Sequence, residues 1–275
     1  METFSKRFGH SQNDKEITVR EDAPQSLREF LIMTLYHFDY TPFFLRDVIC
    51  KVLRVAPDRN NWTDYPNIDG EVHNLIENCD WYKIYDIIEA FARQIKEEKK
   101  QLFHDDLNDF FRTNGIGWKL ENGLIQMRGD ETFETAIKKV ESTLEDAKLK
   151  TAKSEIKEAI ADLSRRPNPD ITGAIQHSLA SLECVCREVS GKKNATLGDI
   201  MKIAGTIIPT PLDQVISKIW GYSSEQGRHL KEGKEPEYLE AELVVELSAT
   251  ISNYLGKKLI SIGSGAEKDD DLPFY

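Results

Sequence analysis

The sequence predicts a mainly α-helical protein with two domains. Apolar residues recur at spacings of three and four over most of the 275 residues, which is the period of one face of a helix. Proline, asparagine and aspartate interrupt this pattern where helices begin or the chain turns. One Asn-Gly dipeptide between two short apolar runs signals a β-hairpin. We therefore expect an N-terminal helical domain with a small β-hairpin, followed by a C-terminal four-helix bundle.

The N-terminal helices follow from apolar stripes. The first is expected across residues 21–38, where Pro24 suits a first helical turn, and the second across 41–56. Asn, Asp and Pro make residues 58–70 a predicted loop. A third amphipathic helix is expected across 78–100, and another around the sequence LNDFF. The stripe of the first helix consists of Leu27, Leu31, Leu35 and Phe38.

The pattern changes in the stretch GWKLENGLIQMRG. Asn122 and Gly123 stand between two short runs there, and this dipeptide favours the type I′ turn of a two-residue hairpin loop. Helical periodicity resumes at Thr132. The charged, alanine-rich stretch 141–163 is long enough to bridge two domains as one helix.

Four further helices are expected in the C-terminal half. Asp170 is placed as the N-cap of the first. The four helices contain the stretches ITGAIQHS, TLGDIMKI, TPLDQVIS and PEYLEAEL, and helices of this kind pack as a bundle. The sequence thus predicts four parts: an N-terminal domain at 1–140, a helical connector at 141–166, a helical bundle at 167–259 and a flexible acidic tail at 260–275.

Composition excludes several classes of protein. No apolar run approaches the roughly 20 residues that span a bilayer, and the first residues lack the apolar stretch of a signal peptide, so we expect a cytoplasmic protein without membrane contact. The net charge of -11 disfavours non-specific capture of nucleic acid over the whole surface, but leaves a local basic cleft open. No nucleotide-binding loop or His/Cys ligand set is present, so we expect no cofactor and no metal. Cys184 and Cys186 are expected to be core residues.

Two sets of motifs lie in order along the chain. FSKRFGH, WYKIYDIIE, LNDFF and GWKLENGLI come first, and NPDITGAIQHSLASLECVC, TLGDI, KIWGYSSEQGRH and SNYLGKK follow. The first set is similar to one class of N-terminal domain of AbiJ-like abortive-infection proteins, and the second resembles the HEPN domain of such proteins. This resemblance implies a role in bacterial defence against phage. HEPN domains are helical bundles that usually dimerise, and many are metal-independent ribonucleases.

The resemblance also points to residues for RNA cleavage. HEPN ribonucleases use an Arg and a His a few residues later, whereas this chain has the adjacent pair Arg228-His229 before the final helix. A His accepts the 2′-OH proton or protonates the leaving oxygen, and an Arg stabilises the phosphorane charge. Glu183 matches an acid of the family pattern and is a third candidate. Two interpretations stay open: catalysis, or a structural contact in which Glu183 pairs with Arg228.

The chain ends in SIGSGAEKDDDLPFY, where residues 263–265 are expected to form a flexible linker. The acidic run after it either aids solubility as a solvated tail or binds a partner. DDDLPF is similar to the acidic tip of bacterial single-stranded-DNA-binding proteins, which implies docking on a protein of DNA metabolism. The candidate docking residues are Asp269, Asp270, Asp271, Leu272, Pro273 and Phe274.

Two functions are consistent with these features. In the first, the chain is an anti-phage protein whose HEPN domain, catalytic or degenerate, acts on RNA as a homodimer without metal. In the second, the HEPN domain is a non-catalytic dimerisation and interaction module that serves as a sensor or scaffold, and the tail docks on a partner protein.

Overall fold

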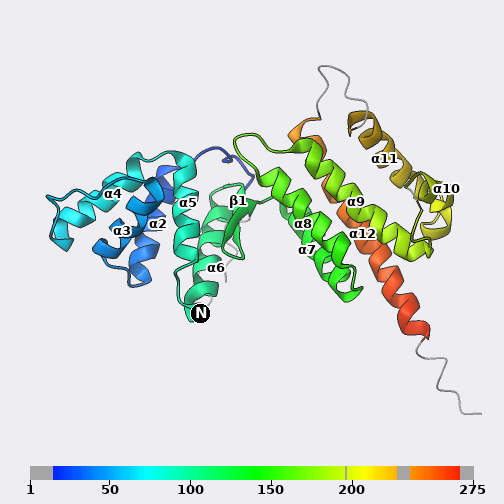
Figure 1. The fold of residues 1–275 in the computed structure, drawn as a ribbon, viewed down its shortest axis with the longest axis horizontal. Coiled ribbons are helices and arrows are strands. Elements are labelled where there is room, and N and C mark those ends of the chain that lie inside the picture. The colour runs from blue at the N-terminus through cyan, green and yellow to red at the C-terminus, as the bar shows by residue number, and fades with distance from the viewer. Residues whose placement is uncertain (1–14, 196, 228–235, 267–275) are drawn as a thin grey trace, which may run out of the picture. The chain divides into compact units, whose positions relative to one another are not determined.

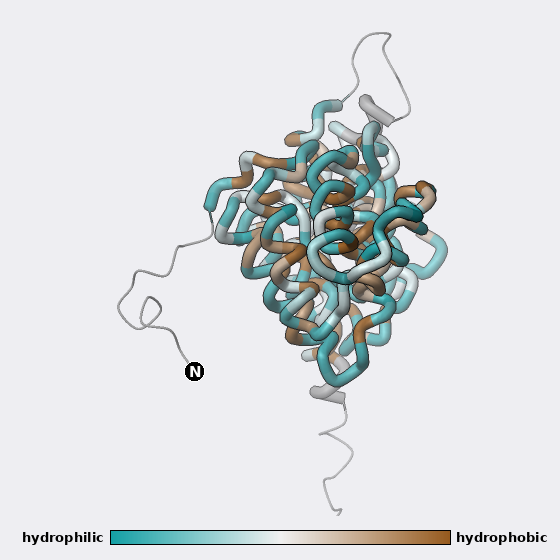
Figure 2. The backbone as a smooth tube through the Cα atoms, turned by 90° about the vertical axis from the view of Figure 1, so that its left-hand side faces the viewer, coloured by the Kyte–Doolittle hydropathy of each residue, from teal (hydrophilic) through white to brown (hydrophobic). Residues whose placement is uncertain are grey.

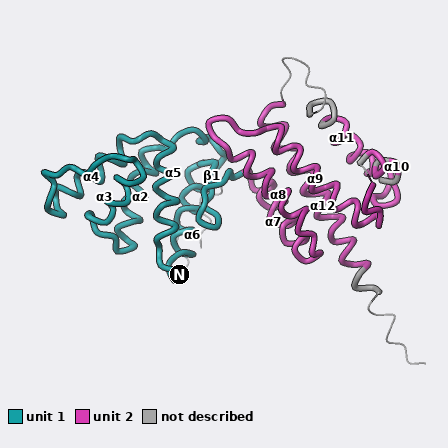
Figure 3. Tube along the Cα trace, in the orientation of Figure 1, with its two compact units in different colours: residues 1–128 teal, residues 129–275 magenta. Residues whose placement is uncertain are grey.

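The computed structural model describes residues 15–195, 197–227 and 236–266. This part is mainly α-helical with one two-stranded antiparallel hairpin, which confirms the predicted fold class. The chain divides into two compact units, unit 1 at residues 1–128 and unit 2 at 129–275 (Figure 3). Hydrophobic and hydrophilic residues alternate along the helices in Figure 2, as expected for helices that bury one face. None of the helices in these residues combines the length and the apolar composition that a membrane-spanning helix needs.

Unit 1 contains helices that begin where local chemistry favours a start. Pro42 occupies the first position of its helix, and the hydroxyl of Thr41 accepts a hydrogen bond from the Phe44 N–H at 3.4 Å. The helical elements of unit 1 are α2 (Gln25–His37), α3 (Pro42–Leu53), the π-helical turn η1 (Asp64–Ile68), α4 (Asp69–Asn78), α5 (Trp81–Ala92) and α6 (Glu97–Thr113) (Figure 1).

Two predicted elements of unit 1 differ from the structure. The predicted loop 58–70 contains η1 and the start of α4, a helix whose fully buried residues are only Val72 and Ile76, too few for a clear stripe. The predicted helix 78–100 divides into α5 and α6. Ile95 lies in the connection and is buried, so the chain leaves the helical path to place this side chain in the core.

The core of unit 1 confirms the stripe predicted for the first helix. Leu27, Leu31 and Leu35 are fully buried on α2. Large aromatic side chains from α5 and α6, Phe91 and Phe111 among them, are also fully buried. Burial of such side chains is the main source of stability for helices that are marginal alone.

The predicted hairpin is confirmed. Strand β1 (Trp118–Glu121) pairs with β2 (Leu124–Met127), and Glu121 stands opposite Leu124. Asn122 and Gly123 form the loop with φ angles of 52° and 78°, so both have the left-handed conformation that a type I′ turn requires.

Unit 2 is a helical bundle in which α9 contacts most of its neighbours. α9 packs against α8 and α12, and α12 also packs against α7 (Figure 1). The shorter helices α10 and α11 pack against each other and against α9. The helices of unit 2 are α7 (Glu131–Asp146), α8 (Lys150–Ser164), α9 (Ile171–Ser190), α10 (Leu197–Ile207), α11 (Asp213–Gly227) and α12 (Tyr238–Ala266).

Two segments of unit 2 differ from their expected form. The stretch predicted as one bridging helix holds the end of α7 and all of α8, separated by a turn in which Lys148 has a φ of 60°. The chain turns there because α7 packs on α12 whereas α8 packs on α9. The prediction of a linker at 263–265 is wrong, since α12 continues to Ala266. Each residue that extends the helix adds one backbone hydrogen bond. These bonds offset the cost of glycine in a helix, which is about 1 kcal/mol per residue.

Candidate functional site

Most of the predicted site residues lie outside the described part of the chain. Arg228 and His229 belong to the segment between α11 and α12 that is not described. The same holds for the tail residues Asp269, Asp270, Asp271, Leu272, Pro273 and Phe274. Glu183 is the predicted site residue that the structure describes.

Glu183 lies on α9 and pairs with Arg187 one turn later, with 2.5 Å between Oε1 and Nη2. Arg187 also donates a hydrogen bond from Nε to the carbonyl oxygen of Ala195 at 2.7 Å. Arg187 thereby connects the turn after α9 to the helix, and Glu183 orients the Arg187 guanidinium. Within the described residues Glu183 therefore pairs with Arg187, whereas a pairing with Arg228 falls outside them.

A hollow of about 530 Å³ opens where the chain passes from α9 to α10, and Ala195, which Arg187 binds, is part of its wall. Lys192, Lys193 and Lys202 line it together with one acid, Asp199, so its charged side chains are mostly basic. Lys202 Nζ lies 3.4 Å from Asp199 Oδ1. Lys192 and Lys193 are exposed, and within the described ranges their side chains form no ion pair. We call this site the lysine hollow.

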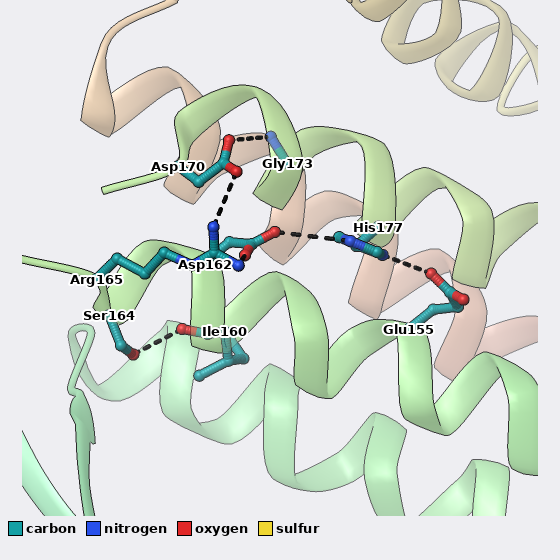
Figure 4. Close-up of polar contacts among 8 residues, drawn as sticks. All are labelled: Glu155, Ile160, Asp162, Ser164, Arg165, Asp170, Gly173 and His177. Atoms are coloured by element: carbon teal, nitrogen blue, oxygen red, sulfur yellow. Dashed lines mark hydrogen bonds and ion pairs between the residues drawn. The ribbon is translucent and has the colours of Figure 1, made fainter. Parts of the chain in front are cut away.

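A second polar cluster joins α8 to α9 (Figure 4). His177 of α9 lies between two carboxylates of α8: its Nδ1 is 2.7 Å from Glu155 Oε2, and its Nε2 is 3.8 Å from Asp162 Oδ2. The hydrogen bond to Glu155 raises the pKa of the imidazole, against the opposing effect of burial. The charges of Asp162 and Glu158 raise this pKa further. The cluster therefore favours a protonated imidazole that holds the two helices together.

Asp162 is the most buried member of this cluster, with 2% of its side chain exposed. Burial raises the pKa of its carboxyl group, whereas the nearby Arg165, 2.7 Å from Oδ1, lowers it. Arg165 also reaches Asp170, whose side chain accepts the N–H of Gly173 at 2.8 Å and so confirms the predicted N-cap of α9. A Cβ on Gly173 would lie 2.5 Å from Asp162 Oδ2, so the absence of a side chain at Gly173 leaves space for the Asp162 carboxylate.

The polar contacts of this cluster serve to connect α8 and α9. Two hydroxyl groups on the same helices bond to their own backbone: Ser164 donates to the Ile160 carbonyl at 2.6 Å (Figure 4), and Ser178 donates to the Ile175 carbonyl at 2.9 Å. The imidazole is instead held by carboxylates. The sequence did not predict this cluster. Glu155 and Asp162 are seven residues apart and so share a helix face, but only the tertiary fold shows that His177 meets them.

The cysteines of α9 have no sign of reactivity. Cys186 is buried, as predicted, and burial raises the pKa of its thiol to about 12. Burial also raises the pKa of the half-buried Cys184. A thiol with a raised pKa is a weak nucleophile and a weak metal ligand. Among the described residues, no group of three or more His, Cys, Asp or Glu side chains is placed to hold a metal ion.

The fold and these sites define a mainly helical protein of two units, with a basic hollow in the second. The model of the family AbiJ N-terminal domain 4 matches residues 2–143. The chain belongs to this family, which confirms the first half of the resemblance and indicates a role in bacterial abortive infection, the defence against phage. Comparisons with curated proteins and with solved structures found no match.

Proposed function

We propose that this abortive-infection protein binds and cleaves RNA through a HEPN-type bundle in unit 2, as a cytoplasmic homodimer and without metal. The lysine hollow is the observation that carries this proposal. The chain has a net charge of -11, so most of its surface repels a polyanion. Lys192, Lys193 and Lys202 gather at one place on this acidic chain, and exposed lysines of this kind bind phosphates.

The arrangement of α9, α10, α11 and α12 supports the HEPN assignment. These helices contain the stretches on which the HEPN resemblance rests, and the last three each pack against α9. The hydroxyl of Tyr222 on α11 donates a hydrogen bond to Glu240 on α12 at 2.8 Å. This contact joins the two helices that flank residues 228–235, the segment that carries Arg228 and His229.

The proposed reaction uses the 2′-OH of RNA as its nucleophile. The 2′ oxygen forms a bond to the adjacent phosphorus while the bond from phosphorus to the 5′ oxygen breaks, which leaves a 2′,3′-cyclic phosphate and a 5′-OH. His229 accepts the 2′-OH proton, and the partner subunit's His229 gives a proton to the leaving oxygen. Arg228 stabilises the charge on the phosphorane. Glu183 acts as a positioning residue, because it orients Arg187 and through it the wall of the lysine hollow.

RNA binding by the purified full chain tests the role of the lysine hollow. Lys192→Ala/Lys193→Ala removes up to two phosphate contacts, so we expect weaker binding and a decrease of about 2 in the slope of log affinity against log salt concentration. Lys138→Ala/Lys139→Ala is the matched control, since these adjacent lysines are exposed on α7. Equal losses in the two variants would contradict a specific role for the hollow.

A non-catalytic interaction module is the second candidate, and apolar side chains exposed on α12 offer it a contact surface that the first candidate also needs as a homodimer. Leu239, Leu243 and Tyr254 are 72%, 55% and 45% exposed, and their spacing places them on one face of the helix. A stripe of this kind fits a dimer contact. In this candidate the tail binds a protein of DNA metabolism, and recovery of such a partner with the wild-type chain but not with Phe274→Ala is the expected result.

A further inference from the structure

A groove of about 350 Å³ lies in unit 1 between α2 and α6. Phe30 and Phe110 stack across it, with 4.1 Å between their ring centroids. Met33 lies beside them with 61% of its surface exposed, a large value for an apolar side chain. Asp106 and Asp109 of α6 supply carboxylates to the same groove. We call this site the α2–α6 groove.

The polar part of the α2–α6 groove attracts cations. Asp106 is partly buried, and this burial raises the pKa of its carboxyl group, as do the charges of Asp105 and Asp109. His37 lies across the groove and acts in the opposite direction. Among the described residues, Asp106 forms no hydrogen bond or ion pair that offsets this burial. A partly desolvated carboxylate in this position favours a ligand with a positive charge.

The chain itself passes close to this groove. The backbone N–H of Lys15 donates a hydrogen bond to the Arg112 carbonyl oxygen at 3.1 Å, and Arg112 is next to Thr113, which lines the groove. Asp106 lies six residues before Arg112 on α6, so about 9 Å separates them along the helix axis. Arg7 lies eight residues before Lys15, a stretch that spans at most about 28 Å. The segment before Lys15 is therefore long enough to reach the groove.

We propose that the α2–α6 groove binds residues 4–8 of the same chain, the stretch FSKRF. Lys6 and Arg7 supply positive charge for Asp106, since Asp109 already pairs with Arg112 at 2.5 Å. The two phenylalanines supply apolar rings for the stacked pair Phe30 and Phe110. The family match begins at residue 2, so this stretch belongs to the same domain as the groove. This inference concerns unit 1 and is independent of the RNA chemistry proposed for unit 2.

Hydrogen exchange measured by mass spectrometry on the full chain tests this contact. In the wild-type protein we expect the amides of residues 2–14 to exchange more slowly than in a free peptide of the same sequence. Asp106→Lys is expected to accelerate this exchange by about tenfold, which corresponds to about 1.4 kcal/mol of docking free energy. Asp105→Lys is the matched control, because Asp105 is exposed on the same helix and does not line the groove.

Charge reversal separates docking from a defect in folding. Arg7→Glu is expected to accelerate the exchange of residues 2–14, and the double variant Arg7→Glu/Asp106→Lys is expected to restore slow exchange. The exchange of α2 and α6 amides monitors the fold in every variant. Exchange of residues 2–14 at the free-peptide rate in the wild-type chain would overturn the proposal, and so would equal acceleration by Asp105→Lys and Asp106→Lys.

Discussion

Two residues of α9, His177 and Gly173, determine how α9 contacts α8. The imidazole lies between Glu155 and Asp162, and the glycine leaves space for the Asp162 carboxylate. Hydrogen bonds to charged groups are stronger than neutral ones, whereas a buried carboxylate left without a partner destabilises the fold. The α8–α9 contact is therefore sensitive both to protonation and to the size of one side chain.

The His177 contact predicts a pH-dependent stability. Glu155 raises the imidazole pKa in the folded state above its unfolded value of about 6.5, and the charges of Asp162 and Glu158 raise it further. The stabilisation is thus fully present below the unfolded pKa and is lost as pH rises through the folded pKa. His177→Gln should lower the free energy of unfolding more at about pH 6 than at about pH 9. Urea unfolding checks this, and a difference that stays constant with pH would contradict it.

Gly173→Ala tests the close approach of the Asp162 carboxylate. The new Cβ would lie 2.5 Å from Asp162 Oδ2 and 2.7 Å from Cγ of the N-cap residue Asp170, so we expect a loss of about 1–3 kcal/mol in the free energy of unfolding. Gly221→Ala on α11 is the control, because a Cβ there meets nothing within 4 Å and alanine favours a helix by about 1 kcal/mol. Denaturant unfolding compares them, and equal effects would refute the steric argument.

At the scale of elements, strong local signals made most helices predictable. α2 and α5 carry wide apolar stripes, and the starts of α3 and α9 follow from Pro42 and Asp170. α4 and the break between α5 and α6 were not predictable. They depend on which side chains the tertiary core accepts, as the buried Ile95 shows.

The β1–β2 loop gives a prediction at this scale. Gly123 has a φ of 78°, where an added Cβ costs about 1–2 kcal/mol, so Gly123→Ala should destabilise the chain by that amount. Gly70→Ala is the control, since Gly70 has open space for a Cβ and lies in the first turn of α4. Thermal unfolding measures both variants, and an unchanged melting temperature in Gly123→Ala would contradict the turn assignment.

At the scale of the whole molecule, the sequence predicted two helical domains but not how the site is assembled. The lysine hollow needs the turn after α9 to bring Lys192 and Lys193 beside Lys202, and the contact of Arg187 with Ala195 holds this turn. The sequence allowed for a local basic cleft but did not indicate where it lies. Arg228 and His229 come from the family resemblance, because an adjacent Arg-His pair has no distinctive spacing.

The exposed stripe of α12 predicts a dimer. Leu243→Glu places a charge within the stripe and should shift the chain from dimer to monomer, because a buried unpaired charge opposes association. Leu124→Glu is the matched control, as Leu124 is 47% exposed on the hairpin of unit 1. Light scattering after size-exclusion chromatography reports the mass, and a monomeric wild-type chain would remove the dimer from the proposal.

Cleavage of RNA by the purified full chain in the presence of a metal chelator tests the central claim most directly. We predict fragments that end in a 2′,3′-cyclic phosphate, no cleavage of the same RNA with 2′-O-methyl groups, and a loss of about 10²-fold or more in rate for Arg228→Ala or His229→Ala. Lys138→Ala/Lys139→Ala should cleave at the wild-type rate. Intact RNA in the wild-type reaction, or equal cleavage by wild type and both site variants, would contradict the account.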